Sequence, residues 1–217
     1  MSKEMSLANV LYKNGNKSKL EVKFNTGCKN YAHYYEKQGR FGEKRFENNK
    51  ILEIGVDMYR GATSVKAWSD YFPNSEIYGI DVLTENANLG IERVKTFIGF
   101  QQDKEFLDKV IDEVKDFDII IDDGSHYNAD IIISFEYLWP HVNPGGVYII
   151  EDIHCTESKT NKFYEKTLPG LTNQIVSKEE FDKWLLEKTR SIHYDPSYGI
   201  EDICFIANGI IIRKLKK

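Results

Sequence analysis

The sequence contains no long apolar run. No stretch approaches the roughly 18 consecutive apolar residues that a membrane-spanning helix requires. The polar residues 1–9 also lack the apolar core of a signal peptide. We therefore expect a soluble, cytoplasmic protein without membrane contact. Its 217 residues, 41% of them hydrophobic, are enough for one sizeable core, so a single domain with excursions is expected.

Cysteine is scarce. Cys28, Cys155 and Cys204 are odd in number and far apart, and their positions match neither a CxxC motif nor a zinc-ligand spacing. This pattern argues against a disulfide framework and against a structural zinc site. We expect the three cysteines to be reduced and without a functional role.

The chain also has no excess of positive charge. Its 29 Lys and Arg residues are outnumbered by 34 Asp and Glu residues, which gives a formal net charge of −5. This balance provides no general attraction to phosphate backbones. The short basic runs at residues 37–45 and 213–217 are typical of solvated faces. A small-molecule substrate is therefore favoured over a nucleic acid.

Short apolar runs alternate with helical patterns from residue 50 onward. The runs are rich in β-branched residues, as expected for strands of a parallel sheet that is buried on both faces. They occupy residues 50–55, 76–81, 94–99, 117–122 and 146–151. Helical patterns lie between them, at residues 64–71, 104–114 and 129–138. The alternation predicts an α/β fold.

The carboxyl-terminal part has a different pattern. Two apolar runs, residues 203–207 and 210–213, are separated only by Asn208-Gly209, the strongest short-range signal of a tight antiparallel hairpin. A turn is predicted earlier, at Asn143-Pro-Gly-Gly. The expected architecture is a doubly wound, Rossmann-like, mostly parallel sheet of seven strands with a carboxyl-terminal hairpin.

Two segments lie outside this plan. Residues 1–49 form an amino-terminal helical segment that precedes the main domain of residues 50–217. One helix of this segment is expected to carry Tyr31, His33, Tyr34 and Tyr35. Residues 155–190 form a polar excursion in which Ser177 and Glu180 have the spacing of a capping box. Connections this long in a compact α/β domain are usually lids or substrate walls, so we expect a substrate cap and a lid.

Glu53, Gly55 and Asp81 end the first two predicted strands. Ligands of an open parallel sheet bind at this edge, where glycine lets the backbone approach them closely. The next glycine, Gly61, does not complete G-x-G-x-x-G, which favours a nucleoside or zwitterionic ligand over a cradled phosphate. Asp81 could accept hydrogen bonds from both ribose hydroxyls, or could be a helix cap or an ordinary turn residue. The three residues together favour an adenosine-type cofactor.

Acidic residues follow the fourth and fifth predicted strands, in Asp122-Asp-Gly-Ser-His and in Glu151-Asp152. Asp123, Glu151 and Asp152 could converge there, and three crowded carboxylates repel one another unless a cation or protons neutralise them. A hard divalent cation with oxygen ligands resolves the repulsion, and Mg²⁺ at about 2.1 Å is the usual choice.

His126 follows Asp123 by three residues, near enough to remove a proton from a substrate oxygen held at such a site. An imidazole with an ordinary pKa of about 6.5 suits a general base at neutral pH. A lone histidine is more often structural, but the acidic surroundings favour catalysis. For His154 three roles stay open: a second base, a residue that orients a metal ligand, and a turn residue.

These motifs together resemble one family. They are Leu52-Glu-Ile-Gly-Val, Tyr78-Gly-Ile-Asp, Asp122-Asp-Gly-Ser-His, Ser134-Phe-Glu, Pro144-Gly-Gly-Val-Tyr and Glu151-Asp152. The chain is similar to the metal-dependent sugar O-methyltransferases of macrolide biosynthesis, the mycinamicin methyltransferase type. It is more distantly similar to the cephalosporin hydroxylase and rhamnosyl O-methyltransferase group. The resemblance covers residues 25–152 well and residues 191–213 loosely, and it implies the class I methyltransferase fold.

The resemblance also implies roles for individual residues. Asp123, Glu151 and Asp152 would be the Mg²⁺ ligands, and His126 would be the general base. S-adenosylmethionine would be held by Glu53, Gly55, Asp81 and Asp122.

Two further cofactor contacts are implied where the chain departs from the family pattern. Phe100 replaces the acidic residue of a Gly-Asp-Gln segment that flanks the adenine, which leaves Gln101 as the expected adenine contact. Thr26-Gly-Cys-Lys corresponds to a Thr-Asp-Lys element, and places Lys29 near the cofactor or the substrate.

The leading hypothesis is methyl transfer from S-adenosylmethionine to a small-molecule hydroxyl with the help of a divalent metal. The acceptor would be a sugar of a glycan or of a glycosylated natural product. Two alternatives are a nicotinamide-dependent oxidoreductase, which the absent G-x-G-x-x-G disfavours, and a non-catalytic nucleoside-binding module, which would not explain the clustered acids. The sequence does not identify the acceptor, and a homo-oligomer stays open.

Overall fold

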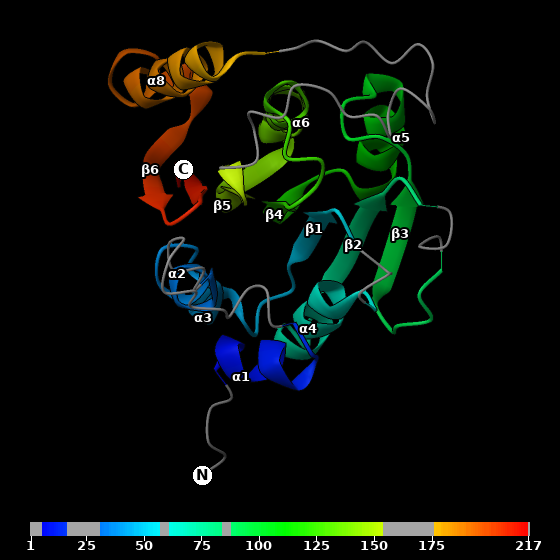
Figure 1. Cartoon of the computed structure of the whole chain (residues 1–217). Coiled ribbons are helices and arrows are strands. Elements are labelled where there is room, and N and C mark those ends of the chain that lie inside the picture. The colour runs from blue at the N-terminus through cyan, green and yellow to red at the C-terminus, as the bar shows by residue number, and fades with distance from the viewer. Residues whose placement is uncertain (1–5, 17–30, 57–60, 84–87, 154–175, 217) are drawn as a thin grey trace.

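The computed structural model describes residues 6–16, 31–56, 61–83, 88–153 and 176–216 (Figure 1). Lys29, His154, Cys28 and Cys155, to which the sequence analysis assigned roles or a redox state, lie outside the described residues, as does the first part of the predicted excursion. No helix among the described residues is long and apolar enough to cross a membrane.

In the described part of the chain, seven strands form one sheet with the order β3-β2-β1-β4-β5-β7-β6. The strands are β1 (Lys50–Ile54), β2 (Glu76–Asp81), β3 (Val94–Ile98), β4 (Phe117–Asp122), β5 (Val142–Ile150), β6 (Ile200–Ile206) and β7 (Gly209–Lys214). Strands β1 to β5 are parallel, and β7 is antiparallel to both β5 and β6. The predicted fold is confirmed, and the strand order reverses between β1 and β4, where open α/β sheets bind ligands.

The central strands are buried because successive side chains supply the cores on opposite faces of the sheet. On β4, Ile119 and Ile121 pack in one core, and Ile120 packs in the other. On β1, Ile51 and Leu52 divide in the same way. This alternation explains why the central strands appear in the sequence as continuous apolar runs.

Helices cover both faces (Figure 1). One core contains buried residues of α1 (Leu7–Lys13), α2 (Tyr31–Lys37), α3 (Phe41–Lys44) and α4 (Thr63–Tyr71). The other contains buried residues of α5 (Lys104–Val114), α6 (Asn128–Leu138) and α8 (Lys178–Tyr194). Short 3₁₀ turns occupy Trp139–His141 and Pro196–Tyr198.

The amino-terminal helices pack directly on the sheet. Leu7 and Leu11 of α1, Tyr35 of α2 and Phe41 of α3 are fully buried in the same core as β1 and β4. These helices therefore contribute to the core of the main domain. The predicted role of residues 1–49 as a substrate cap stays a prediction.

The start of β5 differs from the prediction. Asn143-Pro-Gly-Gly was expected to be a turn before a strand at residue 146, but the strand already begins at Val142. Val142 pairs with Phe117, and the register then shifts before Val147 pairs with Ile119. Gly145 adopts φ +76°, a conformation that glycine tolerates, within this irregular stretch. The predicted capping box of α8 is confirmed, with Ser177 and Glu180 bonded reciprocally.

Candidate active site

The carboxyl ends of β1, β4 and β5 bring the candidate residues to one edge of the sheet. Asp122 at the end of β4 pairs with Ile54 of β1 and with Ile150 of β5. The backbone N–H of Asp123 donates to the Ile54 carbonyl at 3.0 Å, and that of Glu151 donates to the Asp122 carbonyl at 2.9 Å. The loop after β4 and the acid pair after β5 are therefore neighbours.

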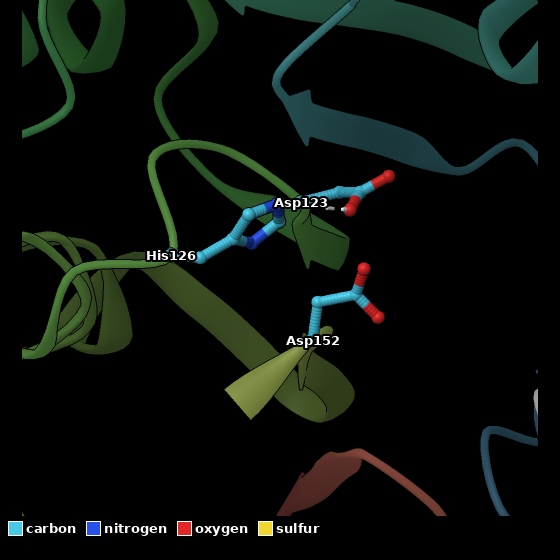
Figure 2. A group of neighbouring side chains, drawn as sticks. All are labelled: Asp123, His126 and Asp152. Carbon is cyan, nitrogen blue, oxygen red and sulfur yellow. Dashed lines mark ion pairs between the residues drawn. The ribbon is translucent and has the colours of Figure 1, made fainter. Parts of the chain in front are cut away.

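Asp123, His126 and Asp152 form a group at this edge (Figure 2). One ligand atom from each lies within 4.8 Å of the other two. The Nε2 atom of His126 is 3.9 Å from Oδ1 of Asp123. Figure 2 shows both carboxylates and the imidazole gathered beyond the ends of the two strands. Two carboxylates and an imidazole are a suitable donor set for a divalent cation.

Two residues of this group have strained backbones. His126 has φ +61° and Asp152 has φ +53°, in the left-handed region that non-glycine residues rarely adopt. Such conformations cost on the order of 1–3 kcal/mol each and persist where the surrounding structure fixes them. The side chains of His126 and Asp123 are 25% and 28% exposed, so a ligand can reach them.

Glu151, the third predicted metal ligand, is placed differently. It is buried, and its Oε1 accepts a hydrogen bond from the Tyr35 hydroxyl of α2. It is not a member of the group formed by Asp123, His126 and Asp152. Its predicted role as a metal ligand stays a prediction.

Tyr31, one helical turn before Tyr35, contacts Asp152. Its hydroxyl lies 2.9 Å from Oδ1 of Asp152 and accepts a hydrogen bond from the Asp152 backbone N–H at 3.2 Å. Burial and the neighbouring carboxylates raise the pKa of both the Tyr31 and the Tyr35 phenol, so both stay protonated. The sequence analysis placed these tyrosines on a helix and gave them no role. Their spacing of four residues, which puts both on one helix face, was the available signal.

A buried polar network lies beneath the loop that carries Asp123 and His126. The Asp122 carboxylate accepts hydrogen bonds from Ser134 Oγ at 2.7 Å, Tyr148 Oη at 3.0 Å and Gln101 Nε2 at 3.0 Å. Burial raises the pKa of Asp122, although these hydrogen bonds act in the opposite direction. Gln101 Oε1 in turn accepts the Ser125 backbone N–H at 2.8 Å. Gln101 therefore connects the end of β4 to the loop.

Asp122 and Gln101 were predicted to contact the cofactor. Asp122 is 1% exposed and Gln101 is 5% exposed, and both have protein partners. Their described contacts support the loop, and their cofactor contacts stay predictions.

Glu53, Gly55 and Asp81 lie at the same edge. Glu53 is fully buried and accepts a hydrogen bond from Ser64 Oγ at 2.7 Å. Asp81 accepts the backbone N–H groups of Val56 and Leu83, each at 2.9 Å. Asp81 therefore fixes the turns after β1 and β2, and its predicted contact with a ribose stays a prediction.

Gly55 is required by a close backbone contact. It has φ +89°, and a Cβ at this position would lie 2.2 Å from the Asp123 carbonyl oxygen. The sequence analysis attributed this glycine to the approach of a ligand. The backbone that approaches it in the structure is that of Asp123, so Gly55 helps to position the candidate metal ligand.

Comparisons with known proteins were made for sequence and for structure. No protein-family model matches the chain. Mycinamicin VI 2''-O-methyltransferase of Micromonospora griseorubida is 38% identical over 142 residues, which cover 63% of this chain and 35% of the relative. Demethylmacrocin O-methyltransferase of Streptomyces fradiae is 39% identical over 117 residues, which cover 52% and 29%. The chain spans about a third of the length of these curated relatives.

A solved structure extends the similarity to the whole chain. The MycE methyltransferase from the mycinamycin biosynthetic pathway, in complex with Mg, SAH and mycinamycin VI, matches with a TM-score of 0.73 and 28% identity. The match covers 99% of this chain and 56% of that chain. The resemblance drawn from the sequence motifs is confirmed. The chain is thus a homologue of the macrolide sugar O-methyltransferases and has the class I methyltransferase fold.

Proposed function

We propose that this chain is an S-adenosylmethionine-dependent and Mg²⁺-dependent O-methyltransferase that acts on a sugar hydroxyl of a glycosylated small molecule. The observation that carries the proposal is the group formed by Asp123, His126 and Asp152 at the carboxyl ends of β4 and β5. It lies at the ligand-binding edge of a fold that matches a methyltransferase solved with Mg and SAH.

In this proposal the chain's own residues orient the acceptor and remove its proton. When bound, S-adenosylmethionine supplies the methyl group and Mg²⁺ supplies Lewis acidity. Asp123, Glu151 and Asp152 would hold the cation with carboxylate oxygens. His126 Nε2 accepts the proton of the acceptor hydroxyl. Methyl transfer to the acceptor oxygen would break the S–CH₃ bond, and the electron pair of that bond would stay on the sulfur of S-adenosylhomocysteine.

In this proposal, residues at the carboxyl ends of β1 and β2 would hold the cofactor. Glu53, Gly55 and Asp81 are at this edge, and Asp122 and Gln101 are below the neighbouring loop. Lys29 is kept as a further contact to the cofactor or substrate. Most of the rate enhancement would come from aligning the methyl group with the acceptor oxygen.

The acceptor is inferred from the relatives. L-olivosyl-oleandolide 3-O-methyltransferase of Streptomyces antibioticus and 8-demethyl-8-alpha-L-rhamnosyl tetracenomycin-C 2'-O-methyltransferase of Streptomyces olivaceus are both named for O-methylation of a compound that carries a sugar. Residues 1–49 and 155–190 would shape the acceptor pocket as cap and lid. The proposal includes neither a nucleic acid nor a membrane as partner.

Binding and turnover measurements test this function. We expect calorimetry to detect binding of S-adenosylhomocysteine and no binding of NAD. We expect methyl transfer to glycosylated macrolides to stop when EDTA removes the metal. Asp123→Ala and Asp152→Ala should each abolish turnover and leave the affinity for S-adenosylhomocysteine largely unchanged. Full turnover in EDTA would exclude the metal, and binding of NAD alone would exclude the methyltransferase.

A further inference from the structure

Two tyrosines of α2 contact two consecutive acidic residues at the end of β5. The Tyr35 hydroxyl donates to Glu151, and the Tyr31 hydroxyl lies 2.9 Å from a carboxylate oxygen of Asp152. We propose that Tyr31 and Tyr35 are positioning residues, which hold this acid pair in the geometry that a divalent cation requires. The inference rests on the proposed function, because it assumes that a cation binds at this edge.

A phenol is a suitable partner for a carboxylate that must attract a cation. It donates a hydrogen bond and carries no charge, so the carboxylate keeps its full negative charge. A lysine or arginine at the same place would offset that charge and would compete electrostatically with the metal. Each hydroxyl also engages one of the two oxygens of its carboxylate, Oε1 of Glu151 and Oδ1 of Asp152.

The two rings are fixed by the core. Tyr31 is 1% exposed and Tyr35 is fully buried. Their rings stack with centroids 5.8 Å apart and an interplanar angle of 12°. The Tyr35 ring also packs against Phe41 at 5.0 Å and Trp68 at 6.0 Å. The hydroxyls are therefore set by packed aromatic side chains, which gives the acid pair a rigid support.

Tyr31 also contacts the backbone of Asp152. Its oxygen accepts the Asp152 N–H at 3.2 Å, so one hydroxyl contacts both the main chain and the side chain of a residue with φ +53°. The same hydroxyl lies 3.2 Å from the carbonyl of Asn208, in the turn between β6 and β7. That carbonyl accepts the Ile153 N–H at 3.1 Å. The Tyr31 hydroxyl and the Asn208 carbonyl thus fix the backbone around Asp152 from two directions.

Removing only the hydroxyls tests the inference. Tyr31→Phe and Tyr35→Phe keep the packed rings, and Tyr71→Phe is the matched control. Tyr71 is a buried tyrosine of α4 whose hydroxyl lies 3.3 Å from Glu36 Oε1. The readout is calorimetric titration of the full chain with MnCl₂ or MgCl₂, in the presence of S-adenosylhomocysteine. We expect each test variant to bind the cation about 10–100-fold more weakly, and the control to bind as the wild type does.

A second measurement separates positioning from simple loss of stability. Turnover of the Tyr31 and Tyr35 variants should recover most of the wild-type rate at saturating Mg²⁺, because only the affinity for the metal has fallen. Melting temperatures identify the folded variants, and Tyr31→Phe alone carries the test if Tyr35→Phe does not fold. The positioning role is contradicted if the folded test variants keep the wild-type cation affinity, or if Tyr71→Phe loses as much cation affinity as they do. Either result leaves the proposed function untouched. A wild-type chain that binds no divalent cation removes the proposed metal site as well.

Discussion

At the scale of single residues, the position of His126 suits two chemical roles, general base and metal ligand. Its Nε2 is 3.9 Å from Oδ1 of Asp123, and it belongs to the group whose ligand atoms lie within 4.8 Å of one another. An imidazole there can accept a proton from the acceptor or can bind the metal itself. Removing the imidazole distinguishes the two roles, because the affinity for the metal should fall only if His126 is a ligand.

We expect His126→Ala to lower the rate of methyl transfer by roughly 10²–10⁴-fold, the usual contribution of a general base. Cation affinity and S-adenosylhomocysteine affinity should stay close to those of the wild type, as measured by calorimetry. A large loss of cation affinity would instead make His126 a metal ligand. Near-normal turnover would place the base elsewhere, and His154 would be the next residue to substitute.

At the scale of the elements, the close approach of the β1 turn to the β4 turn positions Asp123. Gly55→Ala would bring a Cβ to 2.2 Å from the Asp123 carbonyl oxygen, in a backbone with φ +89°. We expect a loss of about 2–4 kcal/mol in the free energy of unfolding, from overpacking and left-handed backbone strain together. Cation affinity should fall as well, because Asp123 must move. Urea unfolding and calorimetry measure the two effects.

Gly90→Ala is the matched control for this substitution. Gly90 has φ +63°, but a Cβ there would meet nothing within 4 Å. It should therefore show only the backbone strain, about 1–2 kcal/mol, with unchanged cation affinity. Equal losses in the two variants would mean that the contact between Gly55 and Asp123 has no energetic consequence.

Elements with a local signal could be predicted from the sequence. Helix α5 begins and ends at the predicted residues, because its apolar face repeats at helical spacing and Asp103 caps its first turn. The hairpin of β6 and β7 follows from Asn208-Gly209 in the same way. The start of β5 could not be predicted, since Asn143-Pro-Gly-Gly has the composition of a turn and becomes a strand only by pairing near Phe117.

Some contacts of the candidate site could also be predicted from the sequence, and others could not. Asp123 and His126 are three residues apart, and the parallel order of strands brings Asp152 beside them, so their meeting follows from the sequence. The contact of Tyr35 with Glu151 joins residues that are 116 positions apart. Such a contact depends on how α2 packs on the sheet. The four-residue spacing puts Tyr31 and Tyr35 on one helix face, but the sequence does not show which residues that face meets.

At the scale of the whole molecule, we expect the titration of Asp130 to make the free energy of unfolding depend on pH. This residue of the first turn of α6 is 8% exposed. Burial, with a smaller contribution from Asp122, raises the pKa of its carboxyl from 3.8 to about 6. The folded chain therefore holds this proton more tightly than the unfolded chain. The contribution of Asp130 to stability is greatest below pH 3.8 and falls as the pH rises to about 6.

We expect Asp130→Asn to gain stability relative to the wild type by about 2–3 kcal/mol between pH 4 and pH 7.5. The comparison uses the difference between the two chains at each pH, so that titration of the other carboxyls cancels. Chemical unfolding at both pH values supplies the free energies. A difference that does not change with pH would mean that Asp130 titrates normally in the folded protein.

The contacts of Tyr31 have a consequence for the folding of the chain. Its hydroxyl reaches Asp152 across 121 positions and the Asn208 carbonyl across 177 positions. Contacts between such distant residues require large loops to close, which costs chain entropy and favours their late formation. We therefore expect the central strands to pair first and the acid pair to reach its final geometry only when the amino-terminal helix and the carboxyl-terminal hairpin have both docked. In a nascent chain the proposed metal site would then be one of the last features to form, after most of the secondary structure.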